Sequence, residues 1–148
     1  MSSARPDLAP TGPADTLITD ATGAQRLVGW VTDVGHPGGA RLTLTVGPQH
    51  GNRHGVLHGG IIAMLLDSAS GYTGSRHIDP DSLPEMLTLS LTTQFLAPAL
   101  AGTTVHATGK VTGGGRRTLF IDGALRDEDG QLLATSTGVY KPVRQDKT

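Results

Sequence analysis

The stretch NRHGVLHGGIIAMLLD, residues 52–67, decides the fold because it joins a polar, glycine-rich loop to an apolar run. Gly59-Gly60 is a poor helix interior but a permitted helix start, since glycine lets other groups approach the backbone. Beyond it, apolar side chains recur at helical spacing on one stripe, formed by Ile61, Ile62, Leu65, Leu66 and Ala69. The pattern predicts a helix that begins at Gly59, frays by Ser75 and buries this stripe.

The opposite side of the predicted helix carries small residues around a single acid, Asp67. At 3.6 residues per turn, this small-residue strip consists of Gly60, Ala63, Asp67, Ser70, Gly71 and Gly74. A helix side that faces solvent usually carries long charged side chains, and this side has none. We therefore expect a close-packed neighbour along the strip, with an ordinary solvent face as the alternative.

Composition limits the classes of function that the chain can have. Its 148 residues contain no repeat, which favours a single domain over 16–148 after a flexible, Pro- and Ala-rich tail at 1–15. The absence of cysteine excludes disulfides, zinc-thiolate sites and cysteine nucleophiles. A net charge of −1 leaves no electrostatic footprint for nucleic acid, and no apolar window suits a membrane span or a signal peptide. We expect a cytoplasmic protein that binds neither nucleic acid nor membrane.

The segments before and after the helix have the features of β-strands. Two predicted strands, 27–34 and 40–46, precede the helix. A third, 87–95, alternates with its leucines and Phe95 on one apolar face, and 103–112, 118–126 and 132–140 follow through short turns. Consecutive hairpins indicate an antiparallel sheet, and only one long apolar helix is available to cover it. The predicted fold class is α+β, with a curved antiparallel β-sheet wrapped around one long central helix.

The loop and the helix start resemble a known family. The residues that carry the resemblance, at fixed spacing, are Asn52, Gly55, His58, Gly59, Gly60 and Asp67. They are similar to the hotdog-fold thioesterases, above all to acyl-CoA thioesterases of the phenylacetate-degradation and 4-hydroxybenzoyl-CoA type. The strand order from about residue 27 to residue 140 also matches that fold. The resemblance implies a hydrolase that acts on acyl-CoA thioesters without a metal or a redox cofactor.

The resemblance also implies roles for individual residues. Asp67 matches the acid that relatives use as nucleophile or as general base on water, and Gly59 matches the glycine whose N–H polarises the thioester carbonyl. His58 and Asn52 match residues that hold the thioester and the attacking group in place. Thr88 lies near a position at which some relatives carry a serine that assists the acid.

The spacing of Gly59 and Asp67 predicts a site shared between two chains. Eight residues of helix separate their backbones by ~12 Å, whereas both groups must lie within roughly 3–3.5 Å of the reacting atoms of one thioester. Two antiparallel helices side by side would bring Asp67 of one copy close to Gly59 of the other, and the small-residue strip would permit this approach. We expect a homodimer, and the resemblance implies a dimer of dimers.

Three other groups of residues have more than one interpretation. His50, His54 and His58 recur every four residues, as metal ligands on a helix could, but the intervening glycines disfavour a helix and no metal site is expected. Arg116 and Arg117 follow three glycines and could bind the phosphates of CoA, or could form a solvated hairpin tip. The aromatic side chains are expected in the core or in a pocket wall, and they are Trp30, Tyr72, Phe95, Phe120 and Tyr140.

Three functions follow from these observations. The first is hydrolysis of an acyl-CoA thioester to a free acid and CoA, with aryl, short-chain and medium-chain acyl groups all open. The second is a hotdog dehydratase or hydratase of 3-hydroxyacyl thioesters, whose usual motifs are absent here. The third is a non-catalytic acyl-CoA-binding protein, which the intact Asp67 and Gly59 disfavour.

Overall fold

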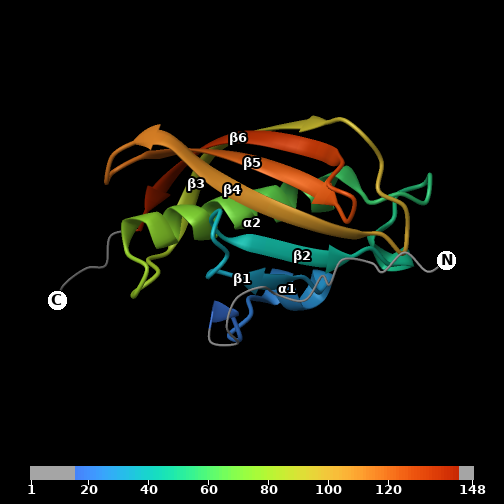
Figure 1. Cartoon of the computed structure of the whole chain (residues 1–148), viewed down its shortest axis with the longest axis horizontal. Coiled ribbons are helices and arrows are strands. Elements are labelled where there is room, and N and C mark those ends of the chain that lie inside the picture. Colours follow the sequence, from blue (N-terminus) through green and yellow to red (C-terminus); the bar gives the residue numbers. More distant parts are fainter. Residues whose placement is uncertain (1–15, 144–148) are drawn as a thin grey trace.

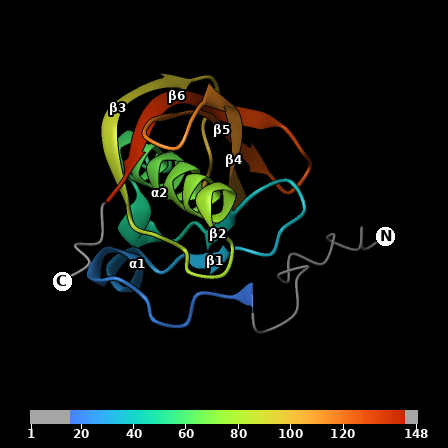
Figure 2. The same cartoon turned by 90° about the vertical axis from the view of Figure 1, so that its left-hand side faces the viewer.

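A single antiparallel sheet curves around one long helix in the computed structural model, which describes residues 16–143. The six strands have the order β1-β2-β4-β5-β6-β3, and the helix α2 spans Gly59–Ile78. Figures 1 and 2 show how the strands enclose α2 from above and below. The predicted α+β hotdog architecture is confirmed, whereas the tail predicted at 1–15 lies outside the described residues.

The strands lie close to the predicted segments. Their bounds are β1 (Val31–Asp33), β2 (Arg41–Thr45), β3 (Met86–Phe95), β4 (Thr104–Gly114), β5 (Leu119–Asp127) and β6 (Leu132–Pro142). Hairpins join β4 to β5 and β5 to β6, as predicted. The turn after β5 places Gly130 at a φ of 83°, a backbone conformation that glycine adopts at no steric cost. Over the described residues, no helix is long and apolar enough to cross a bilayer.

The strand predicted over 27–34 is wrong in its first half. A short helix, α1 (Gly23–Val28), occupies that part of the chain. Thr22 caps it by accepting the Gln25 N–H at 3.2 Å, and Gly29 ends it at a φ of 93°. A short apolar run cannot distinguish a helix end from a strand, so the cap and the left-handed glycine decide the conformation.

The apolar stripe of α2 forms the centre of the core. Ile62, Leu65, Leu66 and Ala69 are each at most 4% exposed and pack in one cluster with side chains from β2, β4, β5 and β6. The helix continues to Ile78, three residues beyond the predicted end. Burial of these four side chains, with Ile61 partly buried beside them, explains why the helix positions both its first residue and its acid rigidly relative to the sheet.

The small-residue strip of α2 divides into a packed half and an open half. Ser70 is fully buried, and a Cβ added to Gly74 would lie 2.8 Å from the Ile121 Cδ1 atom of β5. The close-packed neighbour of this half is therefore the sheet of the same chain. A Cβ added to Gly71, in contrast, would meet no atom within 4 Å, and Asp67 stays half-buried.

A β-bulge in β3 changes which side chains face the helix. The pairing of β3 with β6 shifts register between Thr88 and Ser90, which leaves Leu89 without a partner. The single apolar face predicted for 87–95 is therefore wrong at its start, and Leu87 and Leu89 are 52% and 56% exposed. Residues opposite each other in an antiparallel pair share a face, so the bulge puts Thr88 on the same side as its partner Tyr140.

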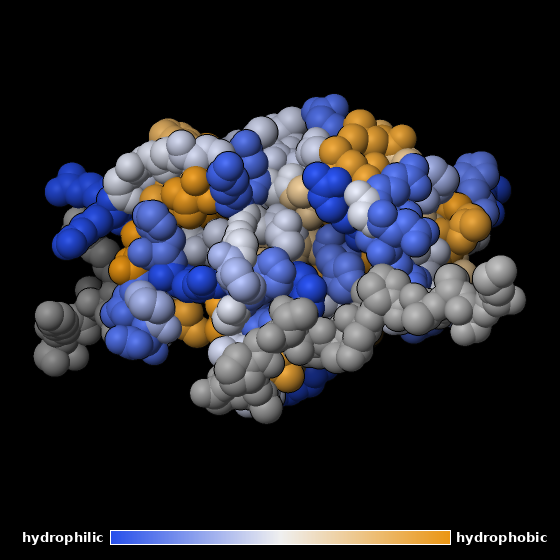
Figure 3. Space-filling model, in the orientation of Figure 1, coloured by the Kyte–Doolittle hydropathy of each residue, from blue (hydrophilic) through white to orange (hydrophobic). Residues whose placement is uncertain are grey.

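Exposed apolar side chains gather along and just beyond β3, the edge strand. Five large ones are between 52% and 62% exposed, namely Leu87, Leu89, Phe95, Leu96 and Leu100. In Figure 3 an apolar patch lies at the upper right, where Figure 1 draws the end of β3, and the smaller apolar patches of this face are separated by hydrophilic side chains. An unpaired strand edge with exposed leucines is a surface that commonly pairs with another chain.

Candidate active site

A buried histidine, His50, holds the loop before α2 in place. His50 is 3% exposed, and its Nδ1 accepts the Gly47 N–H at 2.9 Å. Its Nε2 therefore carries the proton and donates to the Val28 carbonyl at 2.7 Å. Because both ring nitrogens bond within the protein, His50 supports the loop rather than a metal ion. Within residues 16–143, no group of three histidine or acidic side chains could hold a metal.

Asn52 shapes the same loop with its side-chain oxygen. Asn52 Oδ1 accepts the backbone N–H groups of His54 at 2.9 Å and of Val56 at 3.3 Å. Its carbonyl accepts the N–H of Gly55, which has a φ of 75°. These bonds occupy the amide oxygen, so the amide nitrogen is the atom of Asn52 that remains for a ligand. An open hollow lined by residues 51–54 and His58 lies beside this loop.

His58 caps α2 and leaves one backbone donor open. Its Nδ1 accepts the Gly60 N–H at 2.8 Å, and its carbonyl accepts the N–H groups of Ile61 and Ile62. The first helix turn has no other free donor than the Gly59 N–H, which has no acceptor in the described part of the chain. This N–H lies at the positive end of the helix dipole and is suited to a negative or carbonyl oxygen.

An aromatic ring forms the wall next to this open donor. A Cβ added to Gly59 would lie 3.3 Å from Phe95 Cε1, so the ring already contacts the helix start. Phe95 comes from the far end of β3 and is 58% exposed. The prediction that Phe95 belongs to a core or a pocket wall agrees with its place at the mouth of the Gly59 site.

Asp67 lies in the middle of α2 with one oxygen held and the other open. Its Oδ1 accepts the Thr88 hydroxyl at 2.7 Å and the Tyr140 hydroxyl at 3.2 Å. No donor among residues 16–143 bonds Oδ2. The structure thus places Thr88 beside the acid, as the resemblance implied. A carboxylate held on one side by two neutral donors can attack a carbonyl carbon, or can remove a proton from water, with its other side.

Tyr140 is the member of this group that the sequence did not identify as functional. It is 1% exposed, and burial together with the negative charge of Asp67 raises the pKa of its phenol above the usual value. Tyr140 therefore remains a neutral hydrogen-bond donor at physiological pH. Its one sequence signal is the alternation in β6 that puts Ser136, Gly138 and Tyr140 on the same face.

Within one chain, the predicted site residues form separate groups. Asn52, His58 and Gly59 lie at the start of α2, whereas Asp67 and Thr88 lie about two turns further along. Because α2 is continuous between Gly59 and Asp67, their backbones are separated by ~12 Å. One chain therefore holds both the open N–H of Gly59 and the acid Asp67, but the two groups are not in contact with each other.

The two arginines lie towards the other end of α2. Arg116 and Arg117 are exposed at the tip of the β4–β5 hairpin. The base of that tip, Leu119, packs in the same cluster as Ile78, the last residue of α2. Arg116 and Arg117 are thus not near Gly59 of their own chain, and a hairpin tip open to solvent describes their position.

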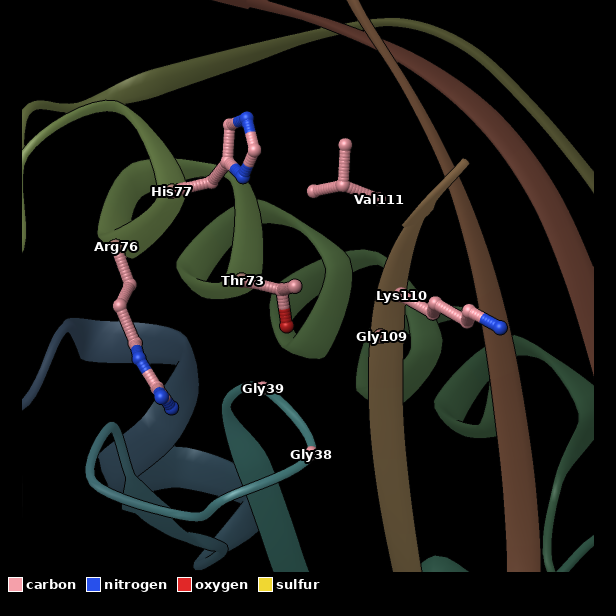
Figure 4. Close-up of a pocket in the computed structure, with 8 residues that line it drawn as sticks. All are labelled: Gly38, Gly39, Thr73, Arg76, His77, Gly109, Lys110 and Val111. Carbon is pink, nitrogen blue, oxygen red and sulfur yellow. The ribbon is translucent and has the colours of Figure 1, made fainter. Parts of the chain in front are cut away.

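A second hollow opens near the end of α2 and contains none of the predicted site residues. Its volume is about 220 Å³, and it lies between α2, β4 and the loop before β2, with Gly38, Gly39, Thr73, His77, Gly109 and Lys110 in its lining. Figure 4 shows Arg76, His77 and Lys110 pointing in different directions. Arg76 turns towards the loop, where it donates to the carbonyls of Val34 and His36. The cationic groups therefore do not converge on one ligand.

Comparison with known proteins identifies the family. Residues 54–134 match the family model described as the thioesterase superfamily. A Pseudomonas aeruginosa protein, PA0474, which is named as a proposed esterase, is 27% identical over 99 residues, or 67% of this chain and 72% of that protein.

Two solved structures are similar over most of both chains. The BH2602 protein of Bacillus halodurans, solved with CoA, has a TM-score of 0.76 and 26% identity over 86% of this chain and 83% of that chain. The PaaI protein of E. coli, from the phenylacetic acid degradation operon, has a TM-score of 0.72 and 26% identity over 84% of this chain and 87% of that chain. The chain therefore belongs to the thioesterase superfamily and is an enzyme that hydrolyses thioesters.

Proposed function

We propose that the protein hydrolyses acyl-CoA thioesters to a free acid and CoA, with Asp67 as the reacting acid and the Gly59 N–H as the oxyanion donor. The observation that carries this proposal is that α2 presents both groups unoccupied, an open carboxylate oxygen and an open first N–H. The similarity to BH2602, which was solved with CoA, supports CoA as the carrier of the acyl group.

The chemistry of thioester hydrolysis fits these two groups. The ionised Asp67 either attacks the carbonyl carbon or takes a proton from a water molecule that attacks it. The carbonyl oxygen becomes negative and accepts a hydrogen bond from the Gly59 N–H, and the C–S bond then breaks. In the general-base route the proton that Asp67 took from water passes to the leaving CoA sulfur, and in the nucleophilic route the CoA thiolate takes its proton from solvent. In the nucleophilic route, water subsequently hydrolyses the acyl–Asp67 anhydride. A preorganised N–H of this kind typically contributes a factor of about 10²–10³ in rate.

We infer that a second copy of the chain completes each site. Gly59 and Asp67 are ~12 Å apart along one helix, which is too far for a single thioester. The open half of the small-residue strip and the exposed leucines of β3 together form a surface on which a second copy could pack. A two-fold axis at this edge would run two α2 helices antiparallel and bring Asp67 of each copy towards Gly59 of the other. A dimer of dimers is the larger assembly that the family resemblance suggests.

The same arrangement gives Arg116 and Arg117 a role. In an antiparallel pair, the hairpin tip near the end of one α2 lies towards the Gly59 end of the other. Two exposed guanidinium groups there would suit the phosphates of the CoA nucleotide, because their planar forks bind phosphate oxygens in pairs. No metal or redox cofactor is needed for this chemistry.

A panel of alkyl and aryl acyl-CoA thioesters tests the proposal when the released thiol is measured. We expect thiol release from at least one member and its loss in Asp67→Asn, with the folded dimer retained. Hydration or dehydration without thiol release would instead identify a 3-hydroxyacyl-thioester dehydratase or hydratase. Binding without turnover would identify a non-catalytic acyl-CoA-binding protein, and full turnover by Asp67→Asn would remove Asp67 from the mechanism.

A further inference from the structure

We propose that Tyr140 is a positioning residue that decides which oxygen of Asp67 reacts. Tyr140 and Thr88 both donate to Oδ1 of Asp67, so Oδ2 is the oxygen presented to the thioester or to water. This inference rests on the proposed role of Asp67 as the reacting acid. The inference adds Tyr140, a residue of β6, to the site and gives the two carboxylate oxygens of Asp67 different roles.

The pairing of β3 with β6 brings the two donors to one atom. Thr88 and Tyr140 are direct cross-strand partners, and the bulge at Leu89 sets this register. Their hydroxyls therefore approach Asp67 from neighbouring strands on the same face of the sheet. A carboxylate oxygen has two lone pairs, so two donors saturate Oδ1 and leave Oδ2 to react.

Glycine at position 138 makes room for this arrangement. Gly138 lies two residues before Tyr140 in β6 and shares its face. A Cβ at Gly138 would lie 2.6 Å from Tyr140 Cε2 and 3.0 Å from the phenol oxygen, so the ring leans back over this glycine. The buried ring also packs with Leu119 and Ile121, which leaves it little freedom to turn away from Asp67.

The phenol acts as a donor and not as a base. Because burial raises the pKa of Tyr140, the phenol keeps its proton over the working range of a hydrolase. A neutral donor to a carboxylate favours the ionised form and fixes the side-chain orientation. Both effects act on the chemical step, since Tyr140 is buried beneath the acid and is not exposed to substrate.

Steady-state kinetics of Tyr140→Phe tests the inference. We expect kcat to fall about tenfold, as for the loss of one hydrogen bond to a charged group, while KM for acyl-CoA changes by less than about twofold. Ser136→Ala is the matched control, since Ser136 Oγ is buried on the same face of β6 and has no hydrogen-bond partner among the described residues.

A second variant tests the same inference without removing the hydroxyl. Gly138→Ala keeps the phenol but displaces the ring, and it should show the same fall in kcat at similar KM. Wild-type kcat in Tyr140→Phe, with Asp67→Asn inactive, would overturn the role of Tyr140 alone. An equal fall of kcat in Ser136→Ala would also overturn it, because the effect would then come from the core. An active Asp67→Asn would instead overturn the proposed function.

Discussion

Phe95 lies against Gly59, so that the ring at the end of β3 forms a wall beside the first N–H of α2. A Cβ at Gly59 would lie 3.3 Å from Phe95 Cε1 and 3.5 Å from Cζ. The first distance is tighter than most methyl contacts and the second is an ordinary contact, so the ring would have to move by a few tenths of an ångström to accept a methyl group. The contact therefore explains why the position before Gly60 favours a residue without a side chain, in addition to the access that a thioester oxygen needs.

Gly59→Ala should lower kcat/KM more than it lowers stability. The added methyl meets the Phe95 ring and crowds the open N–H, so we expect a loss of about tenfold in kcat/KM, within the range for a weakened oxyanion donor. Alanine is compatible with a first helical position, so the melting temperature should change little. Steady-state kinetics and thermal unfolding measure the two effects. The double variant with Phe95→Ala should recover part of the activity, and its failure to do so would assign the loss to another cause.

Mixing two inactive variants should restore activity if the site is shared between chains. Asp67→Asn and Gly59→Val each disable both sites of their own homodimer. A mixed dimer has one site with both groups intact and one site with neither. Random exchange makes about half of the dimers mixed, so about a quarter of all sites, and of the wild-type activity, should be restored. The measurement is thiol release after the two proteins are unfolded and refolded together. Asp67→Asn refolded with Asp67→Ala is the control, and equal, background activity in both mixtures would place the site within one chain.

Gly71→Leu should weaken the dimer without unfolding the chain. In one chain, a Cβ at Gly71 meets nothing within 4 Å, so a larger side chain at this position begins in open space. If a second α2 packs along the open half of the small-residue strip, leucine prevents that approach. Sedimentation should then show more monomer at equal concentration, together with a lower specific activity on dilution.

The matched variant on the packed half of the strip should behave in the opposite way. Gly74→Ala places a methyl 2.8 Å from Ile121 Cδ1 and 3.1 Å from Met86 Cε, inside the core of one chain. Overpacking of this kind costs about 1–3 kcal/mol, and the better helix propensity of alanine offsets about 1 kcal/mol of this cost, so the free energy of unfolding should fall by up to about 2 kcal/mol. Urea denaturation should detect this loss. A stable but monomeric Gly74→Ala would contradict the division of the strip.

Local patterns explain which features the sequence could predict. The start of α2 at Gly59 depends on adjacent residues, the glycine pair and the apolar stripe after it, and it was found at the predicted residue. The hairpins depend on nearby turn residues and are also in place. The fold class follows from these elements, because one long apolar helix must cover one antiparallel sheet.

Features that depend on distant parts of the chain could not be predicted in the same way. Strict alternation puts Thr88 on the face opposite Leu91, and only the bulge at Leu89 turns it towards Asp67. The contact between Tyr140 and Asp67 spans 73 residues and requires the register of β3 on β6. The place of Thr88 near the acid could come only from the resemblance. For Tyr140, the alternation in β6 indicates which face the ring shares with Ser136 and Gly138, but it does not indicate a contact with Asp67.

Charge reversal at the hairpin tip should affect only substrates that carry the CoA nucleotide. Arg116→Glu with Arg117→Glu removes two exposed cations and should raise KM for acyl-CoA severalfold, since each phosphate contact is charge-assisted. The same variant should hydrolyse the matching N-acetylcysteamine thioester, which lacks the nucleotide, as the wild type does. Added salt should reduce the difference. An unchanged KM for acyl-CoA would leave the tip as a solvated turn.

Stability should decrease as pH falls through the histidine range, and His106 should account for part of the decrease. Burial, reinforced by the nearby Arg41, lowers the pKa of His106, whose Nδ1 lies 2.9 Å from Thr43 Oγ1. Burial also lowers the pKa of His36. In the unfolded chain each group titrates near its ordinary value of about 6.5, so below that pH the unfolded state binds more protons than the folded state.

The contribution of these histidines is therefore fully present above pH ~6.5 and is lost as pH falls towards the lowered pKa of the folded protein. Urea denaturation at a series of pH values from about 8 to 5 should show a constant free energy of unfolding at the upper end and a decline below. His106→Gln should flatten this decline, because the variant has no imidazole to protonate on unfolding. His54→Gln, at an exposed position, is the matched control. A steeper decline in His106→Gln than in the wild type would show that the sign of the linkage is opposite.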